Sequence, residues 1–383
     1  MIYGERIKQV REMHRMTQAD LANEVPSLTQ SRLSRIEKDL APVDDESLAL
    51  IASVTGVNPG FFARPPRPTL QALSPQLRAR SRLTQGEKAA ALQWARLVDE
   101  EYQNLRAKSR VLPMRMDVRH GEPVEQAAAR ARQMLGFTPE QPLPYLILAL
   151  ERLGVTVLGL PYAVESLDAF CLWRDGEPVI AVLKSVPADR VRFSIAHELG
   201  HLLLHQTGQT GQEVEAEAER FAAELLTPIS AMRSAMPRNP TLSALTMLKT
   251  TWGVSVKSLI RRAREIGAVD GERATSLYKQ ISARGWNKKE PGFVPLEKPR
   301  ALRKMAELAY GPAIRTQQLA SGAGWSEHLA LDVLAQHASS DELPFEPLAA
   351  SATDAIASTS RTTARRPLGH TESNVIPFRT RVG

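Results

Sequence analysis

The segment His197-Glu-Leu-Gly-His201 is the feature of this sequence that most restricts its fold. Two histidines four residues apart share one face when the chain is helical, where their Cβ atoms lie about 5–6 Å apart. That separation suits two imidazoles bound to one Zn²⁺ at ~2.0–2.1 Å. Glu198 can reach a metal-bound water without binding the metal. The pattern predicts a helix over about 188–206, with His197 and His201 as zinc ligands and Glu198 as general base.

The alternative is that both histidines only pack and form hydrogen bonds. The chain contains 8 histidines in all. A chance occurrence of this five-residue pattern is then on the order of a one-per-cent event. The metal interpretation is therefore strongly favoured.

A zinc hydrolase site also needs a third protein ligand. We expect the first helix to end near Thr207-Gly208 and a second, over about 213–227, to return antiparallel beside it. Gly200 has no Cβ and would let another element approach closely. The apolar stripe of the second helix leaves Glu215 and Glu217 on opposite shoulders. Periodicity alone therefore leaves these two glutamates equally placed as the third ligand.

His205 lies one turn beyond His201 and extends the same face. It is a group that supports the ligands from behind, a substrate contact or an ordinary polar residue. The one cysteine, Cys171, lies in an apolar stretch and is expected to be a small buried residue. A single cysteine also excludes a disulfide framework and a multi-thiolate zinc site, and it fits a reducing cytoplasm.

The length of 383 residues predicts two or three domains. No apolar run approaches the ~18 residues of a membrane span, and the N-terminus lacks the apolar core of a signal peptide. The formal charge of +7 permits nucleic-acid binding but does not demonstrate it. We expect a multidomain cytoplasmic protein without a membrane segment.

Residues 1–66 predict a compact set of short helices. The first is amphipathic from Ile7, the second begins at Thr17 with a pattern like a capping box, and the third begins at Thr29. A further helix spans Asp45 to Val54, and the segment at 58–60 closes the unit.

Residues 67–118 predict a basic linker and then a helix from Thr84 to about Leu105, whose apolar stripe is either core or a dimer seam. Residues 119–285 mix helices with three strands, at about 155–158, 169–173 and 178–183, and a hairpin turn at 174–177. Helices are expected over 123–135, 142–153 and 243–281. Residues 286–338 predict two more helices, and residues 339–383 predict a disordered tail. The fold class is mainly α with a small sheet (α+β).

Residues 5–62 resemble the phage-repressor or Cro-type helix-turn-helix family called XRE. The resemblance rests on Met16-Thr-Gln-Ala-Asp-Leu-Ala22, Thr29-Gln-Ser-Arg-Leu-Ser-Arg-Ile-Glu37 and Leu48-Ala-Leu-Ile-Ala52. Residues 25–28 depart from it, because the family usually has a shorter turn with a glycine there.

This resemblance implies a double-stranded DNA operator as partner and a recognition helix from about Thr29 to Lys38 in the major groove. Gln30, Ser31 and Arg32 would face base edges, whereas Arg35, Lys38 and Gln18 would hold phosphates. One such unit buries little DNA surface, so we expect a homodimer. The alternative is a small helical dimerisation module.

Residues from about 119 to 285 resemble the ImmA/IrrE family of zinc peptidases. The motifs are Arg192-Phe-Ser-Ile-Ala-His-Glu-Leu-Gly-His201, His205, and Glu215-Ala-Glu-Ala-Glu-Arg-Phe-Ala-Ala-Glu-Leu-Leu-Thr-Pro228. Aligned on Ala218 and Phe221, the ligand glutamate of the family falls on Glu215. Glu219 stands where the family usually has Asn or Asp, and with His205 it is a candidate to support the ligands.

The resemblance implies a zincin-like α+β domain, a Zn²⁺ cofactor and a metalloendopeptidase of the gluzincin type. Together the two resemblances imply a DNA-binding transcription regulator that hydrolyses a repressor-like protein partner or its own helix-turn-helix. The alternative is a non-proteolytic regulator, or the antitoxin of a toxin–antitoxin pair, whose zinc domain senses or binds a partner.

Overall fold

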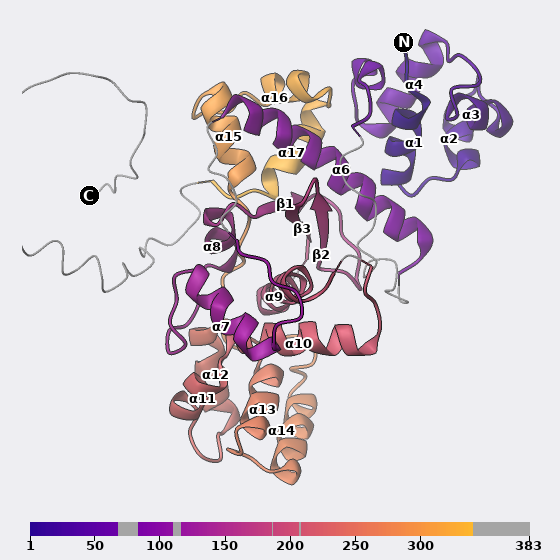
Figure 1. Ribbon diagram of the computed structural model, residues 1–383. Coiled ribbons are helices and arrows are strands. Elements are labelled where there is room, and N and C mark those ends of the chain that lie inside the picture. Colours follow the sequence, from indigo (N-terminus) through magenta and orange to yellow (C-terminus); the bar gives the residue numbers. More distant parts are fainter. Residues whose placement is uncertain (68–82, 110–115, 186, 207, 340–383) are drawn as a thin grey trace, which may run out of the picture. The chain divides into compact units, whose positions relative to one another are not determined.

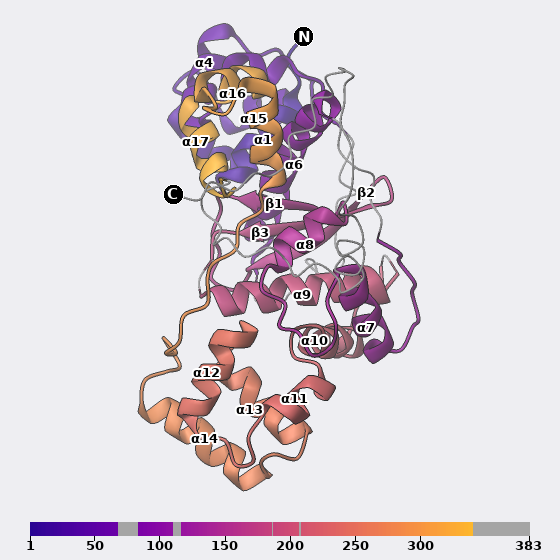
Figure 2. The ribbon, with the colours of Figure 1, turned by 90° about the vertical axis from the view of Figure 1, so that its left-hand side faces the viewer.

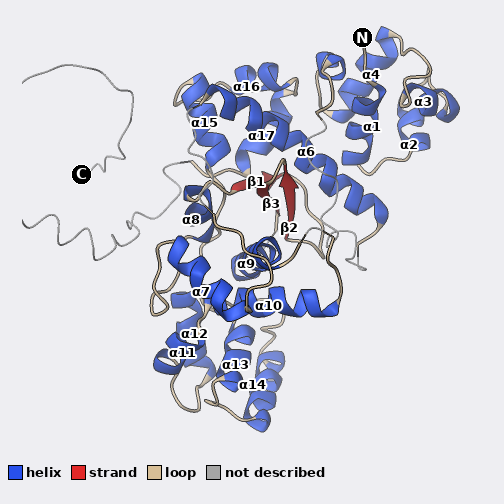
Figure 3. Cartoon of the chain, viewed as in Figure 1, coloured by secondary structure: helices blue, strands red, loops and turns tan. Residues whose placement is uncertain are grey.

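The computed structural model describes residues 1–67, 83–109, 116–185, 187–206 and 208–339 (Figure 1). Most of the predicted basic linker (68–82) and nearly all of the tail predicted to be disordered (340–383) lie outside the described residues. Within the described ranges no helix is long and apolar enough to cross a membrane. The rest of the chain is helical around one small sheet (Figure 3), which confirms the predicted fold class.

The N-terminal unit consists of five short helices, three of which begin at side-chain caps. These are α1 (Gly4–Met13), α2 (Gln18–Glu24), α3 (Gln30–Ile36), α4 (Asp45–Thr55) and η1 (Pro59–Ala63). Thr17 and Asp20 form a reciprocal capping box at the start of α2, and Thr29 caps α3 through the Arg32 N–H. The starts of the second and third helices are therefore as predicted.

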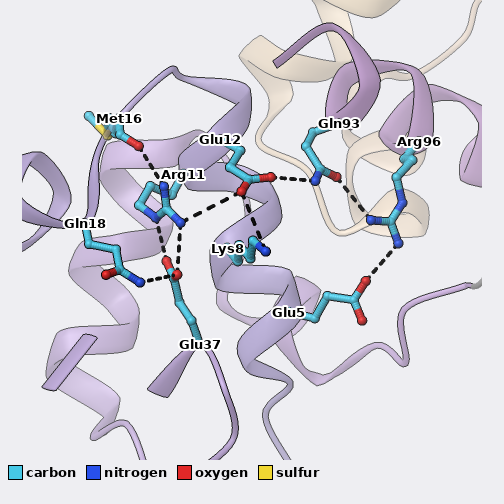
Figure 4. A network of polar contacts seen from close by, with 9 residues as sticks. All are labelled: Glu5, Lys8, Arg11, Glu12, Met16, Gln18, Glu37, Gln93 and Arg96. Carbon is cyan, nitrogen blue, oxygen red and sulfur yellow. Dashed lines mark hydrogen bonds and ion pairs between the residues drawn. The ribbon is translucent and has the colours of Figure 1, made fainter. Parts of the chain in front are cut away.

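A buried ion pair ties these helices together (Figure 4). The Arg11 guanidinium on α1 donates to both oxygens of Glu37, just after α3, at 2.6 and 2.9 Å. The Gln18 side chain at the start of α2 donates to the same carboxylate at 2.8 Å. One carboxylate thus fixes the relative placement of α1, α2 and α3.

Helix α6 (Gln85–Lys108) begins at a second capping box, formed by Thr84 and Glu87. Its predicted apolar stripe is buried within the chain, which supports the core interpretation over an exposed seam. The Trp94 Nε1 on α6 donates to the Met13 carbonyl at 3.1 Å. On the other side α6 reaches the sheet, where Arg106 binds the carboxylate of Glu177. This helix therefore contacts both the N-terminal unit and the sheet.

The sheet has three strands, β1 (Thr156–Leu160), β2 (Ala169–Arg174) and β3 (Glu177–Leu183), in the order β1-β3-β2. β1 and β3 are parallel, and β2 and β3 form the predicted antiparallel hairpin. Asp175 and Gly176 have φ of 47° and 82°, the left-handed pair of a tight hairpin turn. β2 is consequently an edge strand.

One face of the sheet joins a core that also contains the N-terminal unit, α6 and three C-terminal helices. The three are α15 (Ala301–Tyr310), α16 (Thr316–Ala323) and α17 (Glu327–Ala335). The prediction of two helices here was wrong, because α16 is a short helix that ends at Gly324 in the left-handed conformation. After α17, the buried His337 Nε2 accepts the Gly159 N–H of β1 at 3.2 Å.

The opposite face belongs to a second core (Figure 2). Its helices are α7 (Val124–Met134), α8 (Leu146–Arg152), α9 (Ala188–Leu204), α10 (Gln212–Leu226), α11 (Ile229–Ala235), α12 (Leu242–Trp252), α13 (Val256–Glu265) and α14 (Gly271–Ala283). α8 starts four residues later than predicted, since Pro142 and Pro144 favour extended backbone. Gly253 and Gly267, both with positive φ, divide the predicted stretch 243–281 into three helices. α11 was not predicted.

Candidate metal centre

Helices α9 and α10 pack closely where they cross. A Cβ built on Gly200 would lie 3.0 Å from Cδ1 of Phe221, so the missing side chain permits the predicted close approach. The expected antiparallel arrangement was wrong: α9 is seen end-on in Figure 1, where α10 lies along the page, and Figure 2 reverses this. The crossing lets Glu215 of α10 reach two successive turns of α9.

Three ligand atoms converge at this crossing. The Nε2 atoms of His197 and His201 are 3.0 Å apart. The Glu215 oxygens lie 3.4 Å from the first of these nitrogens and 3.5 Å from the second. Tetrahedral bonds of ~2.0–2.1 Å place ligand atoms about 3.3 Å from one another, so this set fits a zinc-sized ion. It is the one His, Cys, Asp and Glu group of this kind found among the described residues.

The protonation of His201 suits a ligand. Burial lowers the pKa of this imidazole to about 4, since the apolar surroundings disfavour its charged form. It is therefore neutral near pH 7 and has a nitrogen lone pair to offer a metal. The Glu215 side chain is 46 % exposed, which leaves the group open to solvent on one side.

Glu198 points into the protein, toward the sheet, and not toward the solvent-exposed side of the three candidate ligands. It is fully buried, and its Oε2 accepts the Cys171 N–H of edge strand β2 at 3.0 Å. This bond fixes the carboxylate beside the metal group. Cys171 itself is buried, as expected of a small core residue.

His205 and Glu217 form a chain of contacts behind His201. The Nδ1 atoms of His201 and His205 are 3.1 Å apart, and the His205 Nε2 is 3.0 Å from Glu217 Oε2. A carboxylate only accepts, so the His205 Nε2 carries the proton and donates it to Glu217. His205 Nδ1 is then an acceptor for the Nδ1–H of His201, and this leaves the His201 Nε2 bare for a metal.

The two glutamates that periodicity could not separate thus do different things. Glu215 lies against both histidines, and Glu217 holds His205. The sequence did not predict that Glu217 would hold His205. The helical wheel had placed Glu217 as close to the histidines as Glu215, which already indicated a position near the metal group. Glu219 contacts none of the ligands in this structure; its carboxylate binds Arg261 of α13.

The predicted DNA contacts lie in the N-terminal unit. Thr29, Gln30, Ser31, Arg32, Arg35 and Lys38 are exposed on and beside α3. Four of the predicted residues already have partners. The Arg32 guanidinium is 3.1 Å from Asp44, and the partly buried Gln18 binds Glu37. Thr29 accepts the Arg32 N–H, and Arg35 donates to the Leu40 carbonyl at 3.5 Å.

Comparison with protein families agrees with both resemblances. Residues 7–62 match the family model described as helix-turn-helix. Residues 150–264, which contain the metal group, match the model of the IrrE N-terminal-like domain, a peptidase family. A search of curated proteins found no match. The chain therefore fuses a helix-turn-helix of the XRE type to an IrrE-like, peptidase-like domain.

Proposed function

Because the chain joins a helix-turn-helix to an IrrE-like domain, we propose that it is a DNA-binding transcription regulator with a zinc-dependent endopeptidase domain. The observation that carries the catalytic part is the mutual spacing of 3.0 to 3.5 Å among the ligand atoms of His197, His201 and Glu215. The substrate we propose is a repressor-like protein partner or this chain's own helix-turn-helix.

In this proposal His197, His201 and Glu215 would hold Zn²⁺, and the ion would supply a Lewis acid for the activation of water and the polarisation of the scissile carbonyl. Glu198 takes the proton of the attacking water as general base. The Cys171 N–H keeps the carboxylate in place, because it donates to Glu198 Oε2. Glu217 and His205 hold the His201 ring in the orientation and tautomer that a ligand needs.

For DNA binding, we place α3 in the major groove. Gln30 and Ser31 at its N-terminal end, with Arg32, face base edges, and Arg35 and Lys38 hold phosphates. Gln18 joins them from the start of α2. A dimer, with one α3 in each half-site, supplies the contact area that a single short helix lacks.

The test compares the full-length wild-type protein with Glu198→Gln, using metal analysis, DNA footprinting and cleavage of a repressor-like partner. Glu198→Gln should retain zinc and operator protection and lose cleavage. Glu213→Gln is the control, since Glu213 is an exposed glutamate on the neighbouring helix α10. Undiminished cleavage by Glu198→Gln, or a wild-type protein that binds its operator but takes up no zinc, would refute the catalytic proposal.

One observation favours a non-proteolytic regulator or antitoxin as the second candidate. Glu198 has no exposed surface, and α6 connects the sheet beside it to the helix-turn-helix. A partner bound at the zinc domain could then change DNA affinity without being cut. A chelator added to the footprinting and cleavage assays tests it: a change in operator affinity while no substrate is cleaved favours this candidate.

A further inference from the structure

A small cavity lies beside the metal group, between α9, α10 and α13. Its volume is about 130 Å³. Phe193 on its wall is one turn before His197 on α9, and Glu219 on its wall is one turn after Glu215 on α10. One helical turn advances ~5.4 Å. The cavity is therefore near enough to receive a side chain of a peptide bound at the metal group.

The wall of this cavity contains a buried guanidinium with unused donors. The Arg262 side chain of α13 is 5 % exposed, and its Nη1 lies 3.3 Å from Glu224 and 2.9 Å from Glu265. Its Nε and Nη2 are buried and have no hydrogen-bond partner within the described part of the chain. Buried donors without an acceptor are rare and costly, so these two N–H groups mark a place for an acceptor from outside the chain.

The charges around the cavity indicate what kind of acceptor fits. Two cations, Arg261 and Arg262, and two carboxylates, Glu219 and Glu265, line it, so its walls are balanced. Glu224 adds a further negative charge against Arg262. These three acids would repel a ligand carboxylate, whereas an uncharged amide has no net charge for them to repel. The carbonyl of an amide can accept from Arg262, and its NH₂ can donate to a lining carboxylate, which has several acceptor sites.

We propose that this cavity is a substrate subsite that selects a glutamine or asparagine side chain close to the scissile bond. A cavity of about 150 Å³ holds a molecule the size of benzene, so 130 Å³ accommodates a side-chain amide and its methylene groups. An extended peptide advances ~3.3 Å per residue, which puts the selected residue within about three positions of the bond that is cut. The inference rests on the proposed peptidase function, because it assigns a substrate to the same site.

The experiment separates binding from cleavage. Full-length, zinc-loaded Glu198→Gln protein is immobilised and used to select from a phage-displayed library of random dodecapeptides. We expect Gln or Asn to be enriched about tenfold at one position, the effect of roughly one to two hydrogen bonds to a buried donor. The selected peptides are then offered to the wild-type enzyme, and the products are identified by mass spectrometry.

Two further variants, each added to the Glu198→Gln background, test the role of the cavity in the same selection. Arg262→Lys keeps the positive charge for Glu224 and Glu265 but removes Nε and Nη2. Ala223→Met fills the cavity from α10 and retains Arg262. Both should abolish the enrichment, whereas Ala216→Met, at an exposed position of the same helix, should keep it.

The outcomes distinguish the two proposals. Selection without Gln or Asn enrichment, or enrichment that survives both Arg262→Lys and Ala223→Met, overturns the subsite even if the wild type cleaves peptides. Enrichment that depends on Arg262 and on the cavity, with no cleavage by the wild type, supports the subsite and refutes the peptidase function.

Discussion

Removal of the Glu217 carboxylate should weaken zinc binding, although this residue is not among the three ligands. Partners that orient a ligand from behind are typically worth 10–100-fold in metal affinity. The Glu217 side chain is 39 % exposed, so water can replace part of its bond to His205, and we expect about a tenfold loss for Glu217→Ala. The His205 side chain is 3 % exposed, and nothing can replace it; His205→Ala should lose about a hundredfold.

Zinc affinity is measured by competition with a chelator at pH 7.5. ¹⁵N NMR of histidine-labelled, metal-free protein reports the tautomers directly, and the wild type should show the proton of His201 on Nδ1. Glu217→Gln retains an oxygen acceptor and should recover part of the affinity. Glu213→Ala is the exposed control on the same helix. The reasoning fails if both Glu217→Ala and His205→Ala bind zinc within twofold of wild type, or if His201 carries its proton on Nε2.

Three further predictions concern stability, measured by urea unfolding of the full chain. Gly200→Ala should lower the free energy of unfolding by about 1–3 kcal/mol, because its Cβ would crowd α10, whereas Gly86→Ala, with open space around it, should be neutral or slightly stabilising. Burial lowers the pKa of His337 to about 4, below the unfolded value of 6.5, so stability falls as the pH drops through that interval. His337 should contribute about 2 kcal/mol to the loss between pH 7.5 and 5, and His337→Gln should remove that part. Glu37→Gln should cost about 3 kcal/mol, because it removes the carboxylate closest to the buried Arg11 charge.

For each of these three stability predictions, one result would contradict the reasoning. Equal stabilities of the two glycine variants would show that the helix crossing is looser than the structure has it. A wild-type pH profile that matches His337→Gln would mean that His337 titrates normally in the folded state. A Glu37→Gln variant as stable as wild type would show that the network of Figure 4 adds nothing to the N-terminal unit.

The local features of this fold could be predicted from the sequence because neighbours along the chain determine them. Thr17, Thr29 and Thr84 begin helices because each presents a hydroxyl to an unpaired backbone N–H. The turn at Asp175-Gly176 requires two residues that tolerate positive φ. His197 and His201 meet because one helix carries both.

The features that depend on how elements dock were harder to predict. A helical wheel places Glu215 and Glu217 symmetrically. Because α10 crosses α9, Glu215 lies against His201, whereas Glu217 binds His205. Arg262 lies 47 positions beyond Glu215 in the sequence, and no local pattern brings it near the metal group. The short helix α16 has too few turns for a clear period.

The hydrogen bond between Glu198 and Cys171 has a consequence for communication across the protein. Side chains alternate along a strand, so while Cys171 belongs to the core beside the metal group, its neighbours Phe170 and Leu172 belong to the core shared with the helix-turn-helix. Glu198 and the core that includes the helix-turn-helix thus lie on opposite faces of one edge strand. A shift of the Glu198 carboxylate would therefore move β2, whose other face packs into the core that includes the helix-turn-helix.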